Sequence, residues 1–211
     1  MLKIYKHIIF LSIFSFALVK AAAQANDLPN PPAHLETIPL GSLVIPMDNT
    51  HQNLVAPFNL KAYGLVNALL QNDIPVKWVI RSGKLKDGID FSATVQRVYP
   101  TAQAASLEDF RASAFIIDST WVNKTPYSNW GQTASQIIAA FGGNVAVYKF
   151  TQNVTVDVRY TLKQRPKIAV FSNGGNQNIH TIILNNAGIS NYTVISAGVF
   201  TGLAECYTFC S

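Results

Sequence analysis

The chain has 211 residues, of which 49% are hydrophobic and 13% are charged, and its formal net charge at pH 7 is +5. The apolar fraction is too high for a disordered chain, and the length suits one domain with its own core. The sequence has no stripe of Lys and Arg of the kind that binds nucleic acid, so we expect no nucleic-acid partner.

The first 25 residues have the pattern of a secretory signal peptide. Lys3 and Lys6 precede an apolar stretch from Ile8 to Val19, and residues 23–25 (AQA) fit the small-x-small pattern of a cleavage site. A membrane-spanning helix needs roughly 20 apolar residues, so an anchor is the weaker interpretation. We therefore expect a secreted or extracytoplasmic protein, periplasmic or at the cell surface, with no transmembrane anchor after the leader is removed.

Most of the positive charge belongs to this leader. It carries Lys3, Lys6 and Lys20 and no acidic residue, so removing it reduces the 16 basic residues to 13 against 11 acidic ones, a net charge of +2. The rest of the chain is therefore nearly neutral, which suits an extracytoplasmic surface.

Residues 26–41 contain four prolines and no apolar period, which is typical of an extended linker. We expect residues 42–211 to form a single domain. It begins with the wholly apolar run at 43–47, which favours a strand buried on both faces of a parallel sheet. Apolar residues at helical spacing predict a helix over 59–72, and residues 76–80 predict the next strand. Such a strand–helix–strand unit normally has a right-handed parallel crossover.

The middle of the chain is less regular. Residues 82–90 are polar and rich in turn formers, and residues 106–109 (SLED) carry a capping signal for a short helix. Residues 114–117 predict a third buried strand. Thr133 and Gln136 have the spacing of a capping box, and the helix that they open should end at residues 142–143 (GG). Another strand is predicted over 145–150.

Residues 154–162 alternate strictly between apolar and polar side chains, which indicates a strand with one wet face. We place it at a sheet edge or in a hairpin outside the main sheet. Residues 168–171 predict a buried strand, 177–187 a helix, and 194–195 part of a final strand. The last three elements repeat the order of the first unit, through duplication or through the ordinary succession of strands and helices. The expected fold is α/β, with a mainly parallel sheet flanked by helices.

Ligands of open parallel sheets bind outside the carboxyl ends of the strands, and several polar residues should lie there. Two carboxylates, Asp48 and Asp118, each follow a buried strand, so they could lie close together and hold a cation or act as acid and base. The simpler interpretation is that each caps a helix or makes a turn. The candidate ligand-binding residues are Asp48, Asn49, Thr50, Asp118, Asn173, Gly174, Gly175, Asn176 and His180.

The glycine loop at 173–176 (NGGN) fits neither G-x-G-x-x-G nor G-x-x-x-x-G-K-[ST], so no cofactor is predicted. Asn-Gly is a strong turn dipeptide, and Asn176 suits a helix N-cap. The amides of the helix N-terminus would still attract an anion. His180 falls on the core-facing stripe of the helix, where a half-buried, hydrogen-bonded role is the simpler interpretation. A role as base or ligand would need a partner, and His51 is the only candidate from an equivalent loop.

Cys206 and Cys210 are the only cysteines in the chain. Export allows a disulfide between them if the backbone brings their Cα atoms within about 7 Å. They could equally remain unpaired. Their spacing is not C-x-x-C and no second ligand pair is present, so we predict no metal site.

The order of strands and helices resembles class I glutamine amidotransferase-like and flavodoxin-like folds, which have a Rossmann-like succession of strands and helices. The resemblance is carried above all by residues 167–189 (KIAVFSNGGNQNIHTIILNNAGI). The resemblance concerns architecture. Relatives of the amidotransferases have a glycine-flanked Cys nucleophile and a later His. Here Cys206 lies between Glu205 and Tyr207, and no His follows it, so the active site does not carry over.

Residues 44–80 and 87–93 (DGIDFSA) also resemble N-terminal modules of large secreted bacterial surface proteins. That resemblance implies a longer parent chain with further domains as partners. We therefore expect a non-catalytic binding or scaffold module, with a small ligand or anion at the strand ends. The alternatives are an amidotransferase-like or hydrolase-like enzyme whose nucleophile lies beyond Ser211, and a periplasmic-type binder of small ligands.

Overall fold

A computed structural model of the chain describes residues 32–54, 58–125, 131–172 and 175–196. The described residues from Ala33 onwards belong to one compact unit. The leader, Asn173, Gly174, Cys206 and Cys210 lie outside the described residues, so the predictions made for them are not addressed by the structure.

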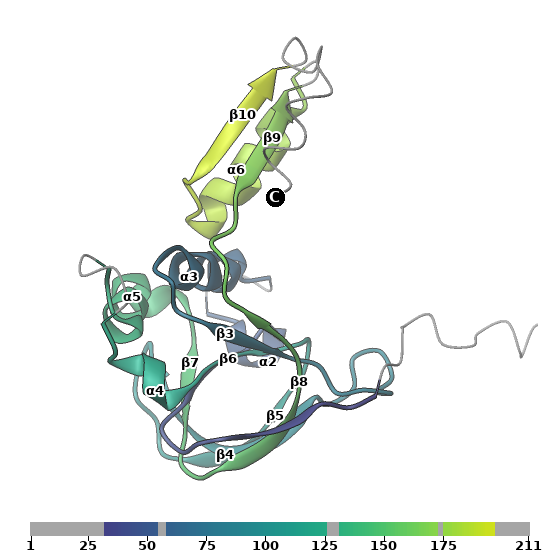
Figure 1. The fold of residues 1–211 in the computed structure, drawn as a ribbon, viewed down its shortest axis with the longest axis vertical. Helices are drawn as coiled ribbons and strands as arrows, with labels where there is room; N and C mark the ends of the chain where they lie inside the picture. Colours follow the sequence, from purple (N-terminus) through teal and green to yellow (C-terminus); the bar gives the residue numbers. More distant parts are fainter. Residues whose placement is uncertain (1–31, 55–57, 126–130, 173–174, 197–211) are drawn as a thin grey trace, which may run out of the picture. The chain divides into compact units, whose positions relative to one another are not determined.

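One curled sheet of eight strands dominates the fold (Figure 1). Its order is β1-β8-β3-β6-β2-β7-β4-β5, and every pair of neighbours is antiparallel. The strands are β1 (Leu35–Ile38), β2 (Leu43–Ile45), β3 (Val76–Val79), β4 (Phe91–Tyr99), β5 (Ser106–Phe110), β6 (Phe115–Ile117), β7 (Val147–Phe150) and β8 (Val154–Leu162).

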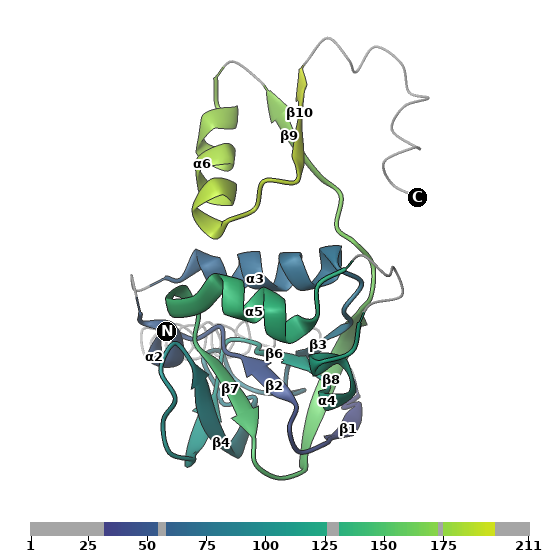
Figure 2. The same ribbon diagram turned by 90° about the vertical axis from the view of Figure 1, so that its left-hand side faces the viewer.

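Helices cover the convex face of this sheet, with α3 and α5 lying side by side above it (Figure 2). Thr133 and Gln136 form the predicted capping box at the start of α5. Asn59 caps α3 by accepting a hydrogen bond from Lys61 N at 3.1 Å. The helices joined to the large sheet are α2 (Asn49–Gln52), α3 (Leu60–Gln71), α4 (Ser119–Val122) and α5 (Ala134–Phe141), followed by a 3₁₀ turn at Gly142–Asn144.

The expected mainly parallel sheet flanked by helices is therefore wrong, and with it the flavodoxin-like, amidotransferase-like and Rossmann-like descriptions. Burial on both faces has a different cause here. Leu43 and Ile45 face the helices, whereas Val44 faces a second core enclosed by the curl of the sheet. A short strand in a curled antiparallel sheet thus has the same apolar run as a strand in a parallel sheet.

Two strand–helix–strand units of the large sheet, β2–α3–β3 and β6–α5–β7, are interleaved rather than adjacent. β2 and β3 run in the same direction, but β6 lies between them and is antiparallel to both. In the same way β6 and β7 run in the same direction on either side of β2. The parallel relation expected between the first two buried strands therefore exists, but these strands do not pair with each other.

Three further expectations are corrected by the large sheet. Residues 106–109 belong to β5 and not to a short helix. The strand predicted at 154–162 exists as β8, but it lies between β1 and β3 inside the sheet and not at an edge or in a separate hairpin. Leu35–Ile38, within the range expected to be a linker, forms β1 because it pairs with β8.

A second, two-stranded sheet follows. It consists of β9 (Ile168–Ser172) and β10 (Tyr192–Ser196), which pair in parallel and are connected by α6 (Gln177–Ala187). These three elements lie where a strand, a helix and a strand are predicted, but β9 is not the buried strand expected, because Val170 is its one buried residue. α6 also contacts α3, and Asn67 Nδ2 of α3 donates a hydrogen bond at 2.9 Å to Asn191 Oδ1, which lies between α6 and β10.

Candidate functional site

The turn after β2 concentrates buried polar side chains. Asp48, His51 and Gln52 are 7%, 6% and 2% exposed, and they are half of the buried polar and charged residues in the described part of the chain. Asp48 precedes α2 and accepts a hydrogen bond from His51 N at 3.0 Å, so it caps the helix. The capping role considered for this carboxylate from the sequence is therefore present.

The His51 imidazole lies between two carboxylates. Its Nδ1 is 2.7 Å from Asp48 Oδ1, and its Nε2 is 3.3 Å from Glu108 Oε2 on β5. The ring stacks on Phe110 at a centroid distance of 4.9 Å and meets the edge of Tyr148 at 5.3 Å. Two aromatic rings thus pack against the imidazole in addition to the two carboxylates.

Charge pairing outweighs burial in this cluster. Burial alone would raise the pKa of Asp48, but the hydrogen bond and the charge of His51 lower it below its ordinary value of 3.8. Burial alone would lower the pKa of His51, but the hydrogen bonds and charges of Asp48 and Glu108 raise it above 6.5. Both ring nitrogens are occupied, so the imidazole offers a substrate neither a lone pair nor an N–H group.

The Gln52 side chain completes the polar turn through hydrogen bonds to backbone groups of Pro46 and Ala146 and to the Asn59 side chain. Its Nε2 donates to the carbonyl oxygens of Pro46 and Ala146, both at 2.9 Å. Its Oε1 accepts from Ala146 N at 3.0 Å and from Asn59 Nδ2 at 3.1 Å. This side chain therefore joins the end of β2 to the approach to β7 and the start of α3.

The other candidates expected near Asp48 lie elsewhere or face solvent. Because β2 and β6 are antiparallel, Asp118 lies at the start of β2, where Ser119 N donates to Ser42 Oγ, while Asp48 lies beyond its end. The carboxylate pair considered as an alternative to capping is therefore not formed. Asp118 caps α4 through Thr120 N at 3.0 Å and has Lys77 at 3.8 Å. The side chains of Asn49 and Thr50 are exposed.

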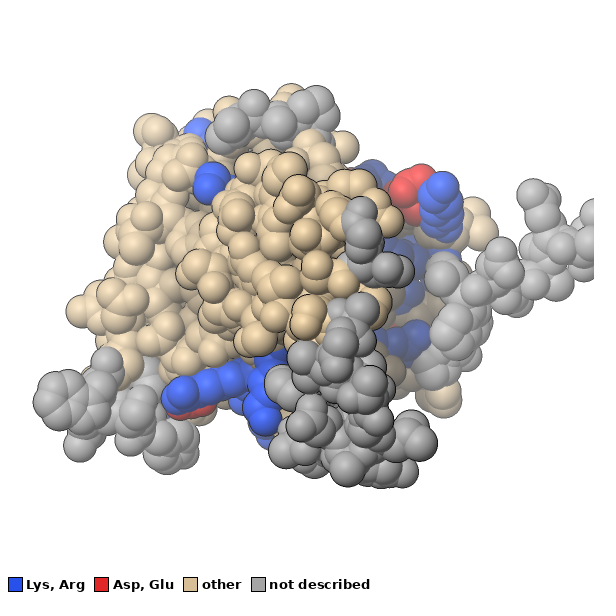
Figure 3. Space-filling view, turned by 90° about the horizontal axis from the view of Figure 1, so that it is seen from above, with Lys and Arg blue, Asp and Glu red and all other residues tan. Residues whose placement is uncertain are grey.

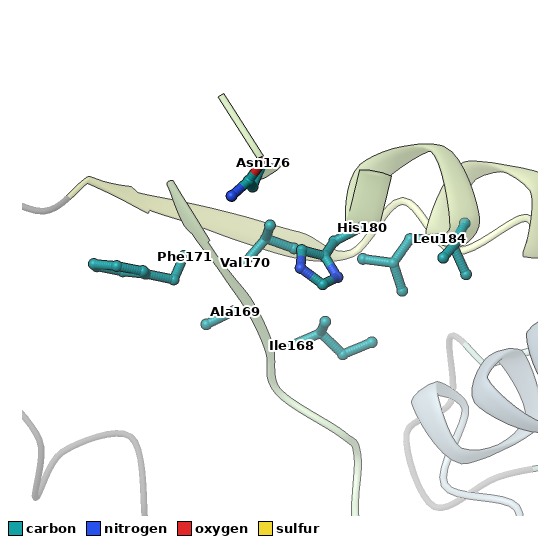
Figure 4. Close-up of a pocket in the computed structure, with 8 residues that line it drawn as sticks. Ile168, Ala169, Val170, Phe171, Asn176, His180 and Leu184 are labelled. Atoms are coloured by element: carbon teal, nitrogen blue, oxygen red, sulfur yellow. The ribbon is translucent and has the colours of Figure 1, made fainter. Parts of the chain in front are cut away.

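An open pocket of about 430 Å³ lies between β9 and α6 (Figure 4). Asn176 and His180 are its polar lining residues, and both are exposed. His180 therefore does not lie half-buried on the core side, and its imidazole projects from α6 beside Val170. The apolar lining residues are Ile168, Ala169, Val170, Phe171, Ile183 and Leu184.

The start of α6 differs from the prediction in one detail. Asn176 occupies the N-cap position, but its backbone is helical and its side chain makes no capping hydrogen bond. Gly175 has φ +96, a left-handed conformation that suits glycine. His51, considered as a partner for His180, is engaged by Asp48 and Glu108 instead.

The surface around the pocket lacks charged side chains. Residues 168–196 contain no Asp, Glu, Lys or Arg. The face seen in Figure 3 is correspondingly almost free of charge at its centre, and Lys and Arg side chains gather at its margins. Three isoleucines of α6, at positions 179, 182 and 183, are 60%, 57% and 46% exposed on this unit.

No family model, curated protein or solved structure matches the chain. In the ranges that the structure describes, no three His, Cys, Asp or Glu residues are grouped so as to hold a metal ion. None of the helices in those ranges combines the length and the apolar character that crossing a bilayer requires.

Sequence reasoning overlooked Gln52 and Glu108. Gln52 follows His51 in a polar loop and carries no motif that distinguishes it from its neighbours. The capping signal at 106–109 predicts a helix at Glu108 and not a strand. The alternating stretch FSATVQRVY at 91–99, followed closely by SLEDF at 106–110, was a usable signal for a hairpin and hence for the correct position of Glu108.

Proposed function

We propose that this chain is a non-catalytic binding module of an exported protein and that it binds an extended peptide strand along β9. The observation that carries the proposal is the open pocket of about 430 Å³ between β9 and α6. Export is inferred from the leader, and the nature of the ligand is inferred from the form and the chemistry of this pocket.

The form of the pocket suits a strand. Consecutive side chains of a strand point to opposite faces, so a cavity above one face would be lined by every second residue. Four consecutive residues, 168–171, line this pocket. Such a pattern is expected of a cavity that runs along the edge of β9, where a further strand could pair with the backbone.

The two-stranded sheet leaves much of the apolar face of α6 exposed. Ile179, Ile182 and Ile183 have the spacing of one helix face, yet each remains about half exposed or more. Neighbouring strands are about 4.8 Å apart, whereas a helix with its side chains is about 10 Å wide. Two strands are therefore too narrow to cover this helix, and a third strand beside β9 would bury more of its aliphatic side chains.

The edges of the two sheets differ in chemistry. β1 and β5, at the edges of the large sheet, carry Glu36, Glu108 and Asp109, and charged residues discourage pairing with another chain. β9 and β10 carry no charge and no proline. This contrast supports strand addition at the small sheet.

We further propose that the added strand belongs to another domain of the same exported protein. Depletion of charged residues is typical of the buried centres of interfaces, and permanent interfaces are the more hydrophobic class. A surface without charged residues from 168 to 196 fits a permanent, uncharged partner better than a soluble anion.

The test is an NMR titration of the ¹⁵N-labelled chain with short acetylated and amidated peptides of alternating valine and threonine. We expect shifts of the amides at 168–171, His180 and Ile183, together with slower amide exchange in β9. Ile183→Glu should abolish these shifts because it places a charge in the pocket lining. Asn178→Glu adds the same charge to the same helix outside the lining and should leave them intact.

Shifts confined to other residues, or equal binding by both variants, would contradict the binding site. Sedimentation of the chain without peptide tests the source of the strand. A dimer that Ile183→Glu dissociates would assign the edge of β9 to a second copy and would overturn the proposed source.

A further inference from the structure

β5 is an edge strand with an unusual attachment. β4 is its only strand neighbour in the described residues. Two side chains of β5 also contact His51 in the α2 turn: Glu108 Oε2 lies 3.3 Å from His51 Nε2, and the buried Phe110 ring stacks on the imidazole at 4.9 Å. Ser106 Oγ donates to Glu108 Oε1 at 2.7 Å and so orients the carboxylate.

The two contacts of His51 require two ring protons. Ionised carboxylates only accept hydrogen bonds, and a neutral imidazole has a single N–H group. Asp48 and Glu108 can both be bonded only by the doubly protonated imidazolium. The shorter contact, 2.7 Å to Asp48, is the one that a neutral ring would keep. The lone pair on Nε2 would then face the Glu108 carboxylate and repel it.

We infer that His51 is a pH-sensitive latch that fastens the edge strand β5 to the α2 turn. When His51 is protonated, Glu108 is bonded and β5 is held at both sides. When His51 loses a proton, the contact with Glu108 is lost, and β5 keeps its pairing with β4 and the packing of Phe110. The raised pKa of His51 agrees with this geometry, since it reports the favourable contacts of the charged ring.

Other charged groups near the latch are engaged elsewhere. Tyr148 of β7 meets the ring edge-on, and burial raises its pKa, so it stays neutral while His51 titrates. Arg97 of β4 lies near Tyr148, whose pKa its charge lowers, and its Nε donates to the Thr101 carbonyl oxygen at 3.1 Å. Arg111 offers Asp48 its backbone N–H at 3.4 Å, while its guanidinium contacts Asp109 and the Asp87 carbonyl oxygen. Asp48 and Glu108 are the carboxylates in contact with the ring.

The experiment follows the His51 ring by NMR from pH 5 to pH 9 and measures amide exchange in both sheets over the same range. Protection factors, corrected for the intrinsic pH dependence of exchange, should fall for residues 106–110 with the midpoint of the His51 titration. Those of β1 at the opposite edge should stay constant. Glu108→Gln should lower the His51 midpoint by about one pH unit, the smallest effect expected of removing a contacting opposite charge, and should uncouple β5 from it.

Asp109→Asn is the matched control, because Asp109 is the neighbouring carboxylate on β5 and bonds to Ser92 of β4 and not to His51. It should leave the His51 midpoint unchanged. Constant protection of β5 in the wild-type chain across the His51 titration would overturn the latch. So would a His51 midpoint that Glu108→Gln fails to move. The wild-type measurement depends on no substitution, so a poorly folded variant cannot obscure the result.

Discussion

The Gln52 side chain and the Ala146 backbone exchange two hydrogen bonds. Gln52 Nε2 donates to the Ala146 carbonyl oxygen at 2.9 Å, and Ala146 N donates to Gln52 Oε1 at 3.0 Å. A side-chain amide thus satisfies both backbone groups of Ala146, as a neighbouring strand would do. Because Gln52 also bonds to Pro46, it connects two segments of the core that are remote in sequence.

Gln52→Leu is expected to lower the free energy of unfolding by about 3 kcal/mol. The leucine fills the site, but it leaves buried backbone groups of Ala146 and Pro46 without partners, at roughly 1–3 kcal/mol for each unsatisfied group. Urea unfolding measures the change. Asn53→Ala, at the exposed next position, should change stability by less than about 0.5 kcal/mol. Equal effects of the two substitutions would contradict the bridging role of Gln52.

Stability should pass through a maximum between the folded pKa values of Asp48 and His51. The pKa of Asp48 is lowered by folding, so its contribution is present above pH 3.8 and is lost as the pH falls through the folded value. The pKa of His51 is raised by folding, so its contribution is complete below pH 6.5 and is lost as the pH rises through the folded value. Urea unfolding midpoints between pH 2 and pH 9 measure both losses of stability, the one at low pH (the acid limb) and the one at high pH (the alkaline limb).

The two limbs can be assigned by substitution. Asp48→Asn should flatten the acid limb, and His51→Gln should flatten the alkaline limb. Asp48→Asn keeps an oxygen that can cap α2, so it separates the charge of Asp48 from its capping role. An alkaline limb that survives in His51→Gln would show that another group controls it.

Local elements of this fold could be predicted from the sequence, whereas strand pairing could not. The helix at 59–72 and the capping box at Thr133 depend on residues close in sequence, and both were found. Pairing depends on the curl of the sheet, which lets its concave face enclose a core of its own. The apolar run of β2 indicates burial but not the direction of the neighbouring strands, so the same run is compatible with a parallel and with an antiparallel sheet.

The same distinction explains the outcome at the candidate sites. Asp48 was found because a polar loop after a buried strand is a local signal. Its separation from Asp118 follows from antiparallel pairing, which no local signal reveals. Glu108 reaches His51 across 57 positions of the sequence, and only the position of β5 in the sheet brings them together.

Gly64→Ala should loosen the contact between α3 and α6. A Cβ at residue 64 would overlap the carbonyl oxygen of Ala187, a backbone atom that cannot rotate away. Alanine favours a helix over glycine by about 1 kcal/mol, but overpacking costs up to about 3 kcal/mol, so we expect a net loss of about 2 kcal/mol. Thermal unfolding measures this loss of stability, and changes in the NMR amide shifts of α6 show where the structure is altered. Gly143→Ala, whose Cβ would meet nothing within 4 Å, should be nearly neutral.

Asp90 is a buried carboxylate that organises two loops. It is 3% exposed, accepts hydrogen bonds from Arg81 N at 3.0 Å and Ser113 N at 2.9 Å, and pairs with Lys84 at 2.7 Å. Its bond to Ser113 holds a residue with φ 67, in the left-handed region. Asp90→Ala removes all of these contacts and leaves the Lys84 ammonium, which is 9% exposed, without its carboxylate.

We therefore expect Asp90→Ala to destabilise the fold by about 3–5 kcal/mol, the usual cost of removing one partner from a buried ion pair. Adding Lys84→Met should restore part of this loss, because the double variant no longer buries an unpaired charge. Chemical denaturation of the wild type, both single variants and the double variant gives the coupling energy directly. Additive effects would mean that Lys84 reaches solvent once Asp90 is removed, and that the backbone bonds of Asp90 account for its whole contribution.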